Sequence, residues 1–260
     1  GTGGTQGAVT YSSSNTSAIT INSTTGALAV VNGNGKSAEI TASLARTTTV
    51  KANSIKKTIT TQKSANPIAV TATQSWAATF STATQDKGFT AATGAQGAVT
   101  YSIKSQKDKN GATVSYFSIP TNSSATLRAA ANTPVNVSAY TVVITATAAG
   151  NDNYSSGSKD ITMTVTFSKA GNPIAVTATQ SISATFSTGN QDKGFTAATN
   201  AQGAVTYSIK SQKNKNNQDV NYFSIPTNSS ATLRMAGNTP VAGSAYTVVI
   251  TATAAGNDNL

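Results

Sequence analysis

Residues 158–169 read SKDITMTVTFSK, and apolar residues alternate in this stretch with threonine. Ile161, Met163, Val165 and Phe167 fall on one face of an extended chain, because successive side chains in a strand point to opposite faces. The threonines between them fall on the other face. This period of two is typical of a β-strand with one buried and one solvated face. The stretch therefore predicts a sheet protein.

The same alternation recurs along the chain. Tyr140, Val142, Ile144 and Ala146 share one face of a second expected strand. Short strands separated by Gly, Asn and Ser turns predict an all-β sandwich. Helices would need stripes of Leu, Glu and Lys that are absent here. Further expected core positions are Val99, Tyr101, Ile103, Phe117, Ile119, Phe80, Phe89 and Leu127.

An internal repeat sets the domain organisation. Residues 65–154 realign with residues 171–260 without a gap, at a period of 106 and with 74 of 90 positions identical. A more distant copy begins at QGAVTY, residues 6–11. We expect three domains: residues 1–64 as a partial domain without its N-terminal strands, residues 65–170 as a complete domain, and residues 171–260 as a domain without its last strand. These segments are called the first, second and third repeats below.

The copies of the repeat start and stop at different points, which leaves two interpretations open. In the simpler one the 260 residues are part of a longer array of repeats. In the other, neighbouring chains complete one another's sheets in a filament. The linkers, residues 63–67 and 169–173, are short and each contains proline, which restrains its own backbone and the residue before it. They predict a rod with limited bending.

Two groups of motifs resemble known families. GAVTYSSSNTSAITINSTTGALAVV, residues 7–31, resembles bacterial immunoglobulin-like (BIG) domains of surface proteins. The second and third repeats, with VTYSIKS, FSI and YTVVITATAAGNDN in order, resemble related cadherin-like repeats. The resemblance implies tandem immunoglobulin-like β-sandwich domains in an extracellular, often bacterial, setting, where such units form adhesin stalks.

The composition excludes several kinds of chemistry. The chain has no Cys and no His, so it has no thiolate or imidazole for catalysis or metal binding. No nucleophile–base pair, phosphate-binding glycine loop or apolar run of about 18 residues is visible. We therefore predict neither enzyme activity nor a cofactor, and no membrane insertion in this segment.

Calcium is the metal that the cadherin resemblance raises. Gly150–Asn153 reads GNDN, and Asp258 lies in the same motif of the third repeat. Calcium needs six to eight oxygens with several carboxylates. The acids of the second repeat are scattered, and an Asp between two Asn is more typical of a turn. We predict a turn and no metal site. Those acids are Asp86, Asp108, Asp152 and Asp160.

The formal charge of +10 raises the question of an anionic partner. Two lysine-rich loops are the candidate contacts for an anionic glycan or wall polymer, against the alternative that they are simply solvated. The lysines are not interleaved with exposed aromatics, so we expect no nucleic-acid binding. The candidate residues are Lys104, Lys107, Lys109, Lys210, Lys213 and Lys215.

Two smaller hypotheses concern individual side chains. Asp86-Lys87 and Asp192-Lys193 precede core phenylalanines, which suggests a Lys–Asn crosslink assisted by a buried acid, or else an exposed turn. Trp76 is the only tryptophan, and Ile182 replaces it in the third repeat. This exchange indicates an apolar packing position and not an exposed sugar-stacking ring.

These observations favour a structural function. We expect the repeat region of a cell-surface protein that acts as a stalk, a spacer or a fibre building block. Its partners would be neighbouring domains of the same array, or like chains in a filament. The alternative is a binding module for carbohydrate or polyanion that uses the basic loops.

Overall fold

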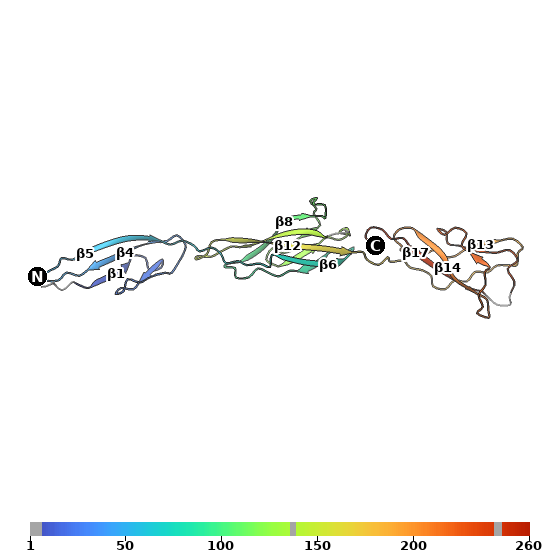
Figure 1. The fold of residues 1–260 in the computed structure, drawn as a ribbon, viewed down its shortest axis with the longest axis horizontal. Coiled ribbons are helices and arrows are strands. Elements are labelled where there is room, and N and C mark those ends of the chain that lie inside the picture. Colours follow the sequence, from blue (N-terminus) through green and yellow to red (C-terminus); the bar gives the residue numbers. More distant parts are fainter. Residues whose placement is uncertain (1–6, 136–138, 242–245) are drawn as a thin grey trace. The chain divides into compact units, whose positions relative to one another are not determined.

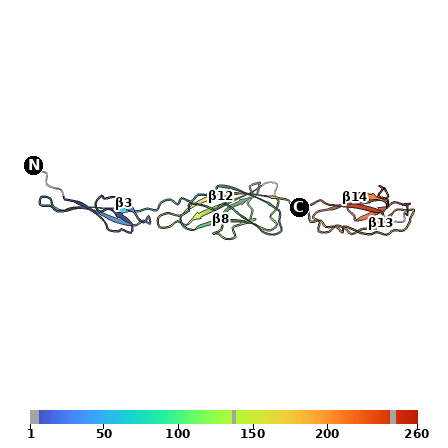
Figure 2. The ribbon, with the colours of Figure 1, turned by 90° about the horizontal axis from the view of Figure 1, so that it is seen from below.

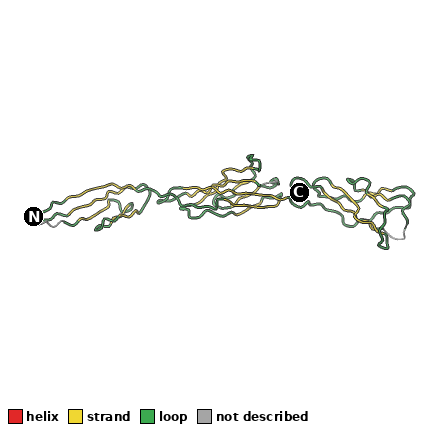
Figure 3. Tube along the Cα trace, in the orientation of Figure 1, coloured by secondary structure: helices red, strands yellow, loops and turns green. Residues whose placement is uncertain are grey.

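The computed structural model describes residues 7–135, 139–241 and 246–260. These residues form strands, turns and loops without any helix, as Figure 3 shows. The chain divides into two compact units. One contains most residues up to Thr166, and the other runs from Phe167 onward and includes Ala77–Thr82 and the segment that begins at Asn132. The prediction of an all-β chain is confirmed.

The larger sheet of the second repeat has four strands. Their order across the sheet is β6 (Thr73–Thr79), β12 (Gly157–Ser168), β11 (Tyr140–Ala148) and β8 (Val99–Lys107). The stretch SKDITMTVTFSK thus supplies β12, which lies between two partners (Figure 1). β11 and β12 pair antiparallel, with Ile144 opposite Ile161.

A smaller sheet covers the other side of the core. Its order is β7 (Gln85–Gly88), β10 (Thr126–Ala129) and β9 (Phe117–Ser118). The rings of Phe117 and Tyr140, one from each sheet, meet edge to face with centroids 5.4 Å apart. Phe89 and Tyr101 make the same kind of contact at 5.2 Å. The two sheets therefore form a β-sandwich, as the sequence predicts.

The predicted core of the second repeat is largely confirmed. The four alternating apolar residues of β12 are buried, and so are the four that were expected on β11. Leu127, Phe89, Tyr101 and Phe117 are also buried. Trp76 is 6% exposed, which confirms it as a packing residue. Four other expected core residues are half-buried: Phe80, Val99, Ile103 and Ile119.

The third repeat has the same small sheet and half of the large one. β13 (Gln191–Gly194), β16 (Thr232–Met235) and β15 (Phe223–Ser224) form the small sheet, and β14 (Val205–Lys213) pairs with β17 (Thr247–Ala254). Figure 2 shows β13 and β14 from below. Residues 179–185, which match β6 in sequence, are not a strand.

The first repeat is smaller. One sheet has the order β1 (Val9–Ser13), β4 (Ser37–Leu44) and β5 (Asn53–Thr60), and β2 (Ile19–Ile21) pairs with β3 (Leu28–Val30). Among its described residues, the buried hydrophobic core consists of Ala18, Ile19 and Ala38, with Ile40 and Ile59 packed against them.

β8 and β14 each contain an irregularity at the same place. Along β8 the pairing with β11 passes from Ile103 directly to Ser105, which leaves Lys104 as the extra residue of a bulge. Lys210 is skipped in the same way between β14 and β17. A bulge changes the side on which the following side chains lie. Gln106 then reaches the backbone of Phe117, accepting its N–H at 2.8 Å and donating to its carbonyl at 3.0 Å.

Candidate functional site

The GNDN motifs form the strongest candidate site. In the second repeat the loop follows β11, and the Asn151 side-chain oxygen accepts the N–H groups of Asn153 and Tyr154 at 2.9 and 3.0 Å. Asn257 accepts from Asn259 and Leu260 in the same way. Asn side chains commonly close turns by bonding their own backbone. The prediction that the motif is a turn is confirmed.

This turn holds the next asparagine against earlier parts of the chain. The carbonyl oxygen of Asn153 accepts the N–H of Ser64 at 2.8 Å. The side-chain oxygen of Asn153 accepts the N–H of Gly33 at 2.8 Å. All three residues belong to the same compact unit. A single asparagine therefore ties the loop both to the linker and to the first repeat.

Gly33 allows this close contact. Its backbone is buried under the loop, and a Cβ atom at this position would lie only 3.0 Å from the Gln62 carbonyl oxygen and 3.2 Å from Asn153 Cα. Any side chain at Gly33 would therefore push against the loop.

The same arrangement recurs 106 residues later. The carbonyl oxygen of Asn259 accepts the N–H of Ala170 at 3.1 Å, and its side-chain oxygen accepts the N–H of Val135 at 2.9 Å. These residues also share one compact unit. Lys169 adds a bond from its ammonium to the Asn257 carbonyl. We call residues 150–154 and 256–260 the junction loops.

The aspartate of the motif lies beside the first repeat, and the expectation that it binds no metal stays a prediction. Asp152 Oδ2 lies 3.4 Å from Nδ2 of the Asn32 side chain. Within the described ranges, no three acidic, His or Cys side chains gather where they could hold a metal ion. The carboxylates of Asp86 and Asp160 are engaged by cations of the protein itself.

The crosslink hypothesis placed Asp86 and Lys87 near the core. Both are exposed, and they lie in β7 rather than in a turn before a strand. Asp86 instead receives two hydrogen bonds of 2.7 Å from the Arg128 guanidinium on β10. These bonds hold the pKa of the Asp86 carboxyl below its usual value. With an exposed carboxylate paired to arginine, the arrangement lacks the buried acid that the hypothesis requires.

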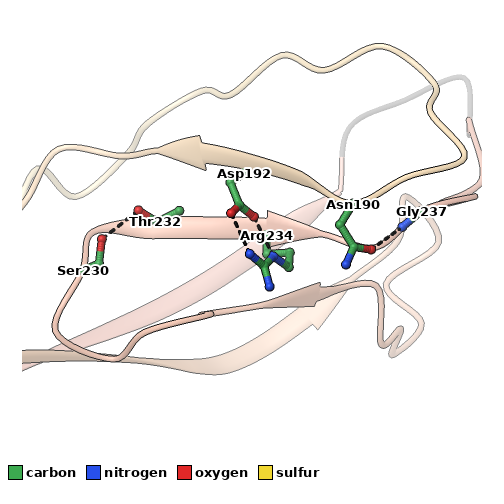
Figure 4. Close-up of polar contacts among 6 residues, drawn as sticks. All are labelled: Asn190, Asp192, Ser230, Thr232, Arg234 and Gly237. Carbon is green, nitrogen blue, oxygen red and sulfur yellow. Dashed lines mark hydrogen bonds and ion pairs between the residues drawn. The ribbon is translucent and has the colours of Figure 1, made fainter.

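The third repeat preserves this ion pair. Figure 4 shows the two parallel bonds from Arg234 to Asp192, each 2.7 Å long. They likewise lower the pKa of the Asp192 carboxyl. Lys193 beside it is half-buried. Neither arginine was expected as a partner from the sequence, because each stands 42 residues after its aspartate and no local pattern links the two.

The six candidate lysines divide equally between the second and third repeats. Lys104 reaches across β11 to Asp160 on β12, with the ammonium 2.6 Å from Oδ2. Hydrogen bonds from Lys104 and from the Thr145 hydroxyl lower the pKa of this carboxyl. Lys210 occupies the equivalent place on β14, and residues 171–260 contain no counterpart of Asp160.

The other lysines lie at the ends of β8 and β14 and in the turns that follow. Lys213 is paired with Asp219 at 2.7 Å. Lys107, Lys109 and Lys215 are exposed. The structure thus places two of the six in ion pairs, and contact with a polyanion stays a prediction.

Comparison with known proteins yields distant structural likenesses. No family model matches the chain, and no curated protein matches it. Among the described residues there is no helix long and apolar enough to cross a membrane.

The solved structures to which the chain is similar include cadherin extracellular domains. Protocadherin gamma B2 extracellular cadherin domains 3–6 is 12% identical, with 95% of this chain and 65% of that chain covered and a TM-score of 0.35. Mouse protocadherin-24 EC1-3 is 15% identical, with 96% and 85% covered and a TM-score of 0.37. Drosophila N-cadherin EC1-4 is 12% identical, with 95% and 64% covered and a TM-score of 0.34.

The chain therefore spans less than two thirds of the length of the first of these structures. At such identities and TM-scores, the likeness says nothing of what this chain binds or does.

Proposed function

We propose that the chain is a structural repeat region of an extracellular surface protein, in which tandem β-sandwich repeats act as a stalk or spacer. The repeats at residues 1–64, 65–170 and 171–260 are its building units, and like chains or neighbouring domains are its partners. A spacer has to transmit orientation from one unit to the next. The observation that supports this role is the pair of junction loops with their matching hydrogen bonds.

The junction loops have the properties that a restrained joint needs. Each supplies one side-chain acceptor and one carbonyl acceptor from a single asparagine, so the loop is held at two points. Each asparagine is itself held by a turn built on the Asn two positions earlier. Two-point attachment limits rotation about a linker more than a single hydrogen bond does, and the proline in each linker adds to this restraint.

The test is a double variant, Asn153→Ala with Asn259→Ala, studied by ¹⁵N relaxation. We expect the repeats to tumble with clearly different rotational correlation times in this variant and with closely similar ones in the wild type. The matched control is Asn110→Ala with Asn216→Ala, which changes two exposed loop asparagines. Equal relaxation of wild type and both variants would refute the role of the junction loops.

A polyanion-binding module is the second candidate. The exposed Lys109 and Lys215 and the formal charge of +10 favour it. Surface charge attraction of this kind weakens steeply with salt. The test is binding of dextran sulfate at about 50 and 300 mM salt, with Lys109→Glu plus Lys215→Glu as the variant. Binding of dextran sulfate that changes neither with salt nor in the variant would exclude a polyanion-binding module.

A further inference from the structure

The first repeat contains two Asn-Gly pairs in succession, in the stretch NGNG at residues 32–35. An asparagine that is followed by glycine is prone to deamidation, because glycine has no Cβ to hinder attack by its own backbone nitrogen. Asn32 lies in the contact with the junction loop, whereas Asn34 is exposed. The two pairs therefore present the same chemistry in two different surroundings.

The reaction requires the backbone nitrogen of the glycine to reach the side chain before it. This nitrogen attacks Cγ of the asparagine, the new N–Cγ bond closes a succinimide ring, and the Cγ–Nδ2 bond breaks. The proton of the backbone N–H leaves with Nδ2 as ammonia. Water then opens the ring at either carbonyl, which gives aspartate or isoaspartate. Because the nucleophile and its target are neighbours in one chain, the reaction needs no other partner than water.

At Asn32 both reacting groups are held in place. The Gly33 N–H, whose nitrogen is the nucleophile, donates to Asn153 Oδ1 at 2.8 Å. Oδ1 of Asn32 accepts the Asn34 N–H at 2.9 Å, and its Nδ2 lies 3.4 Å from Asp152 Oδ2. Gly33 is also buried. A backbone nitrogen that is bonded in this way cannot turn toward Cγ, so the closed contact suppresses the reaction.

The neighbouring pair, Asn34 and Gly35, is in more open surroundings. Asn34 is exposed, and Gly35 has a φ of 67° with open space within 4 Å of the place that a Cβ would take. The Gly35 N–H bonds within its own turn, to the Gly33 carbonyl at 3.0 Å. This turn can open without separating distant segments of the chain. Asn34 should therefore react as an unprotected pair does.

We propose that Asn32 is a deamidation site that the junction loop protects, and that its reaction makes an opening of this contact permanent. While Asn153 holds the Gly33 N–H, Asn32 remains an amide. Once the contact opens, deamidation places a carboxylate at Asn32, opposite the carboxylate of Asp152. Two like charges at this separation repel each other, and isoaspartate also lengthens the backbone beside Gly33. The contact therefore does not re-form.

The matching position of the second junction cannot react in this way. There Pro134 precedes Val135, whose N–H donates to Asn259 Oδ1 at 2.9 Å. Proline has no side-chain amide, so an opening of this contact stays reversible. The two junctions match in their hydrogen bonds and differ in their chemistry.

The direct test follows deamidation by mass spectrometry of digested protein after incubation near neutral pH, with fragment ions that distinguish Asn32 from Asn34. In the wild type Asn32 should react at least about tenfold more slowly than Asn34, because its reaction waits for a local opening. In Asn153→Ala the rate at Asn32 should rise at least about tenfold, whereas the matched variant Asn259→Ala should leave it unchanged. Equal rates at Asn32 and Asn34 in the wild type, or an unaltered rate in Asn153→Ala, would overturn the proposal.

A second set of variants tests whether the product keeps the contact open. Asn32→Asp supplies the carboxylate directly, so hydrogen exchange of the Gly33 N–H should become at least about tenfold faster. Asn34→Asp adds the same charge at the exposed pair and should leave this exchange unchanged. Adding Asp152→Asn to the Asn32→Asp chain should restore slow exchange, because it removes the repelling charge. Slow Gly33 exchange in Asn32→Asp alone would show that deamidation does not hold the contact open.

The inference rests on the contact at Gly33 and not on the spacer role. The relaxation test of the junction loops measures how the repeats tumble. The mass measurement instead detects a covalent change at a single residue. Either result can therefore be negative while the other is positive.

Discussion

The second and third repeats share 74 of 90 aligned residues, yet their larger sheets differ. Every residue of β11 that is buried from Val142 to Ala148 has an identical counterpart in β17, and each counterpart is only half-buried. Residues 73–79 form β6, whereas residues 179–185 form no strand. The difference follows from β12, which lies between β6 and β11, whereas among the described strands β17 pairs with β14 alone. Whether a segment forms a strand therefore depends on the neighbouring strands as well as on its own residues.

The largest expected effect comes from making the second repeat resemble the third. Met163→Asp places a carboxylate at a position that is 1% exposed in β12. A buried unpaired charge should cost the second repeat more than about 3 kcal/mol. Trp76 is the only tryptophan and lies in this repeat, so its fluorescence during denaturation with urea reports the loss.

Thr166→Asp is the control for this substitution. Thr166 is exposed in the same strand, so it changes the charge without burying it. We expect an unfolding midpoint close to that of the wild type. Equal destabilisation by both substitutions would mean that β12 does not seal the sandwich in the way that its burial indicates.

A smaller effect should distinguish the two repeats at one matched core position. Leu127→Ala removes a side chain that is 0% exposed and should cost about 3 kcal/mol, because it leaves a closed cavity. Leu233→Ala should cost less, about 2 kcal/mol, since Leu233 is 8% exposed and lines an open groove of the third repeat. Native-state hydrogen exchange in β10 and β16 measures the unfolding free energies of the two repeats within one chain. Equal costs at the two leucines would contradict this expectation.

The sequence predicted the strands better than the contacts between distant segments. The alternation in SKDITMTVTFSK was sufficient to identify β12 and its buried face, since a period of two has one structural meaning. It could not predict that residues 179–185 lose their strand, because they differ from β6 only at Ile182 and Ser183. Whether residues 179–185 form a strand depends on a partner strand and not on their own sequence.

The junction contacts were beyond sequence reasoning for a related cause. The asparagines of GNDN predicted a turn, which depends on neighbouring residues. The side-chain oxygens of Asn153 and Asn259 accept backbone N–H groups that lie 120 and 124 residues away, at Gly33 and Val135. Backbone donors are present at every residue except proline, so no side-chain pattern distinguishes them. The Asp86–Arg128 pair was equally hidden, because in a repeat without gaps every pair of residues keeps its separation in both copies.

The smallest expected effect is a difference in acid stability. Lys104 and Thr145 hold the pKa of the Asp160 carboxyl below its usual value near 4. A carboxyl whose folded pKa is lowered stabilises the fold above its unfolded pKa, and this contribution is lost as the pH falls toward the folded value. The stability of the second repeat should therefore decrease below about pH 5.

Asp160→Asn should make this loss of stability at low pH less steep in the second repeat. It should leave the third repeat unchanged, because residues 171–260 contain no counterpart of Asp160. Asp86 and Asp192 carry equivalent arginine pairs, so their contributions cancel when the two repeats are compared. The effect is small, since the pair is exposed and water screens it. Unfolding midpoints of wild type and variant between about pH 3 and pH 7 measure it. A parallel shift at all pH values would instead mean that Asp160 acts through packing and not through its charge.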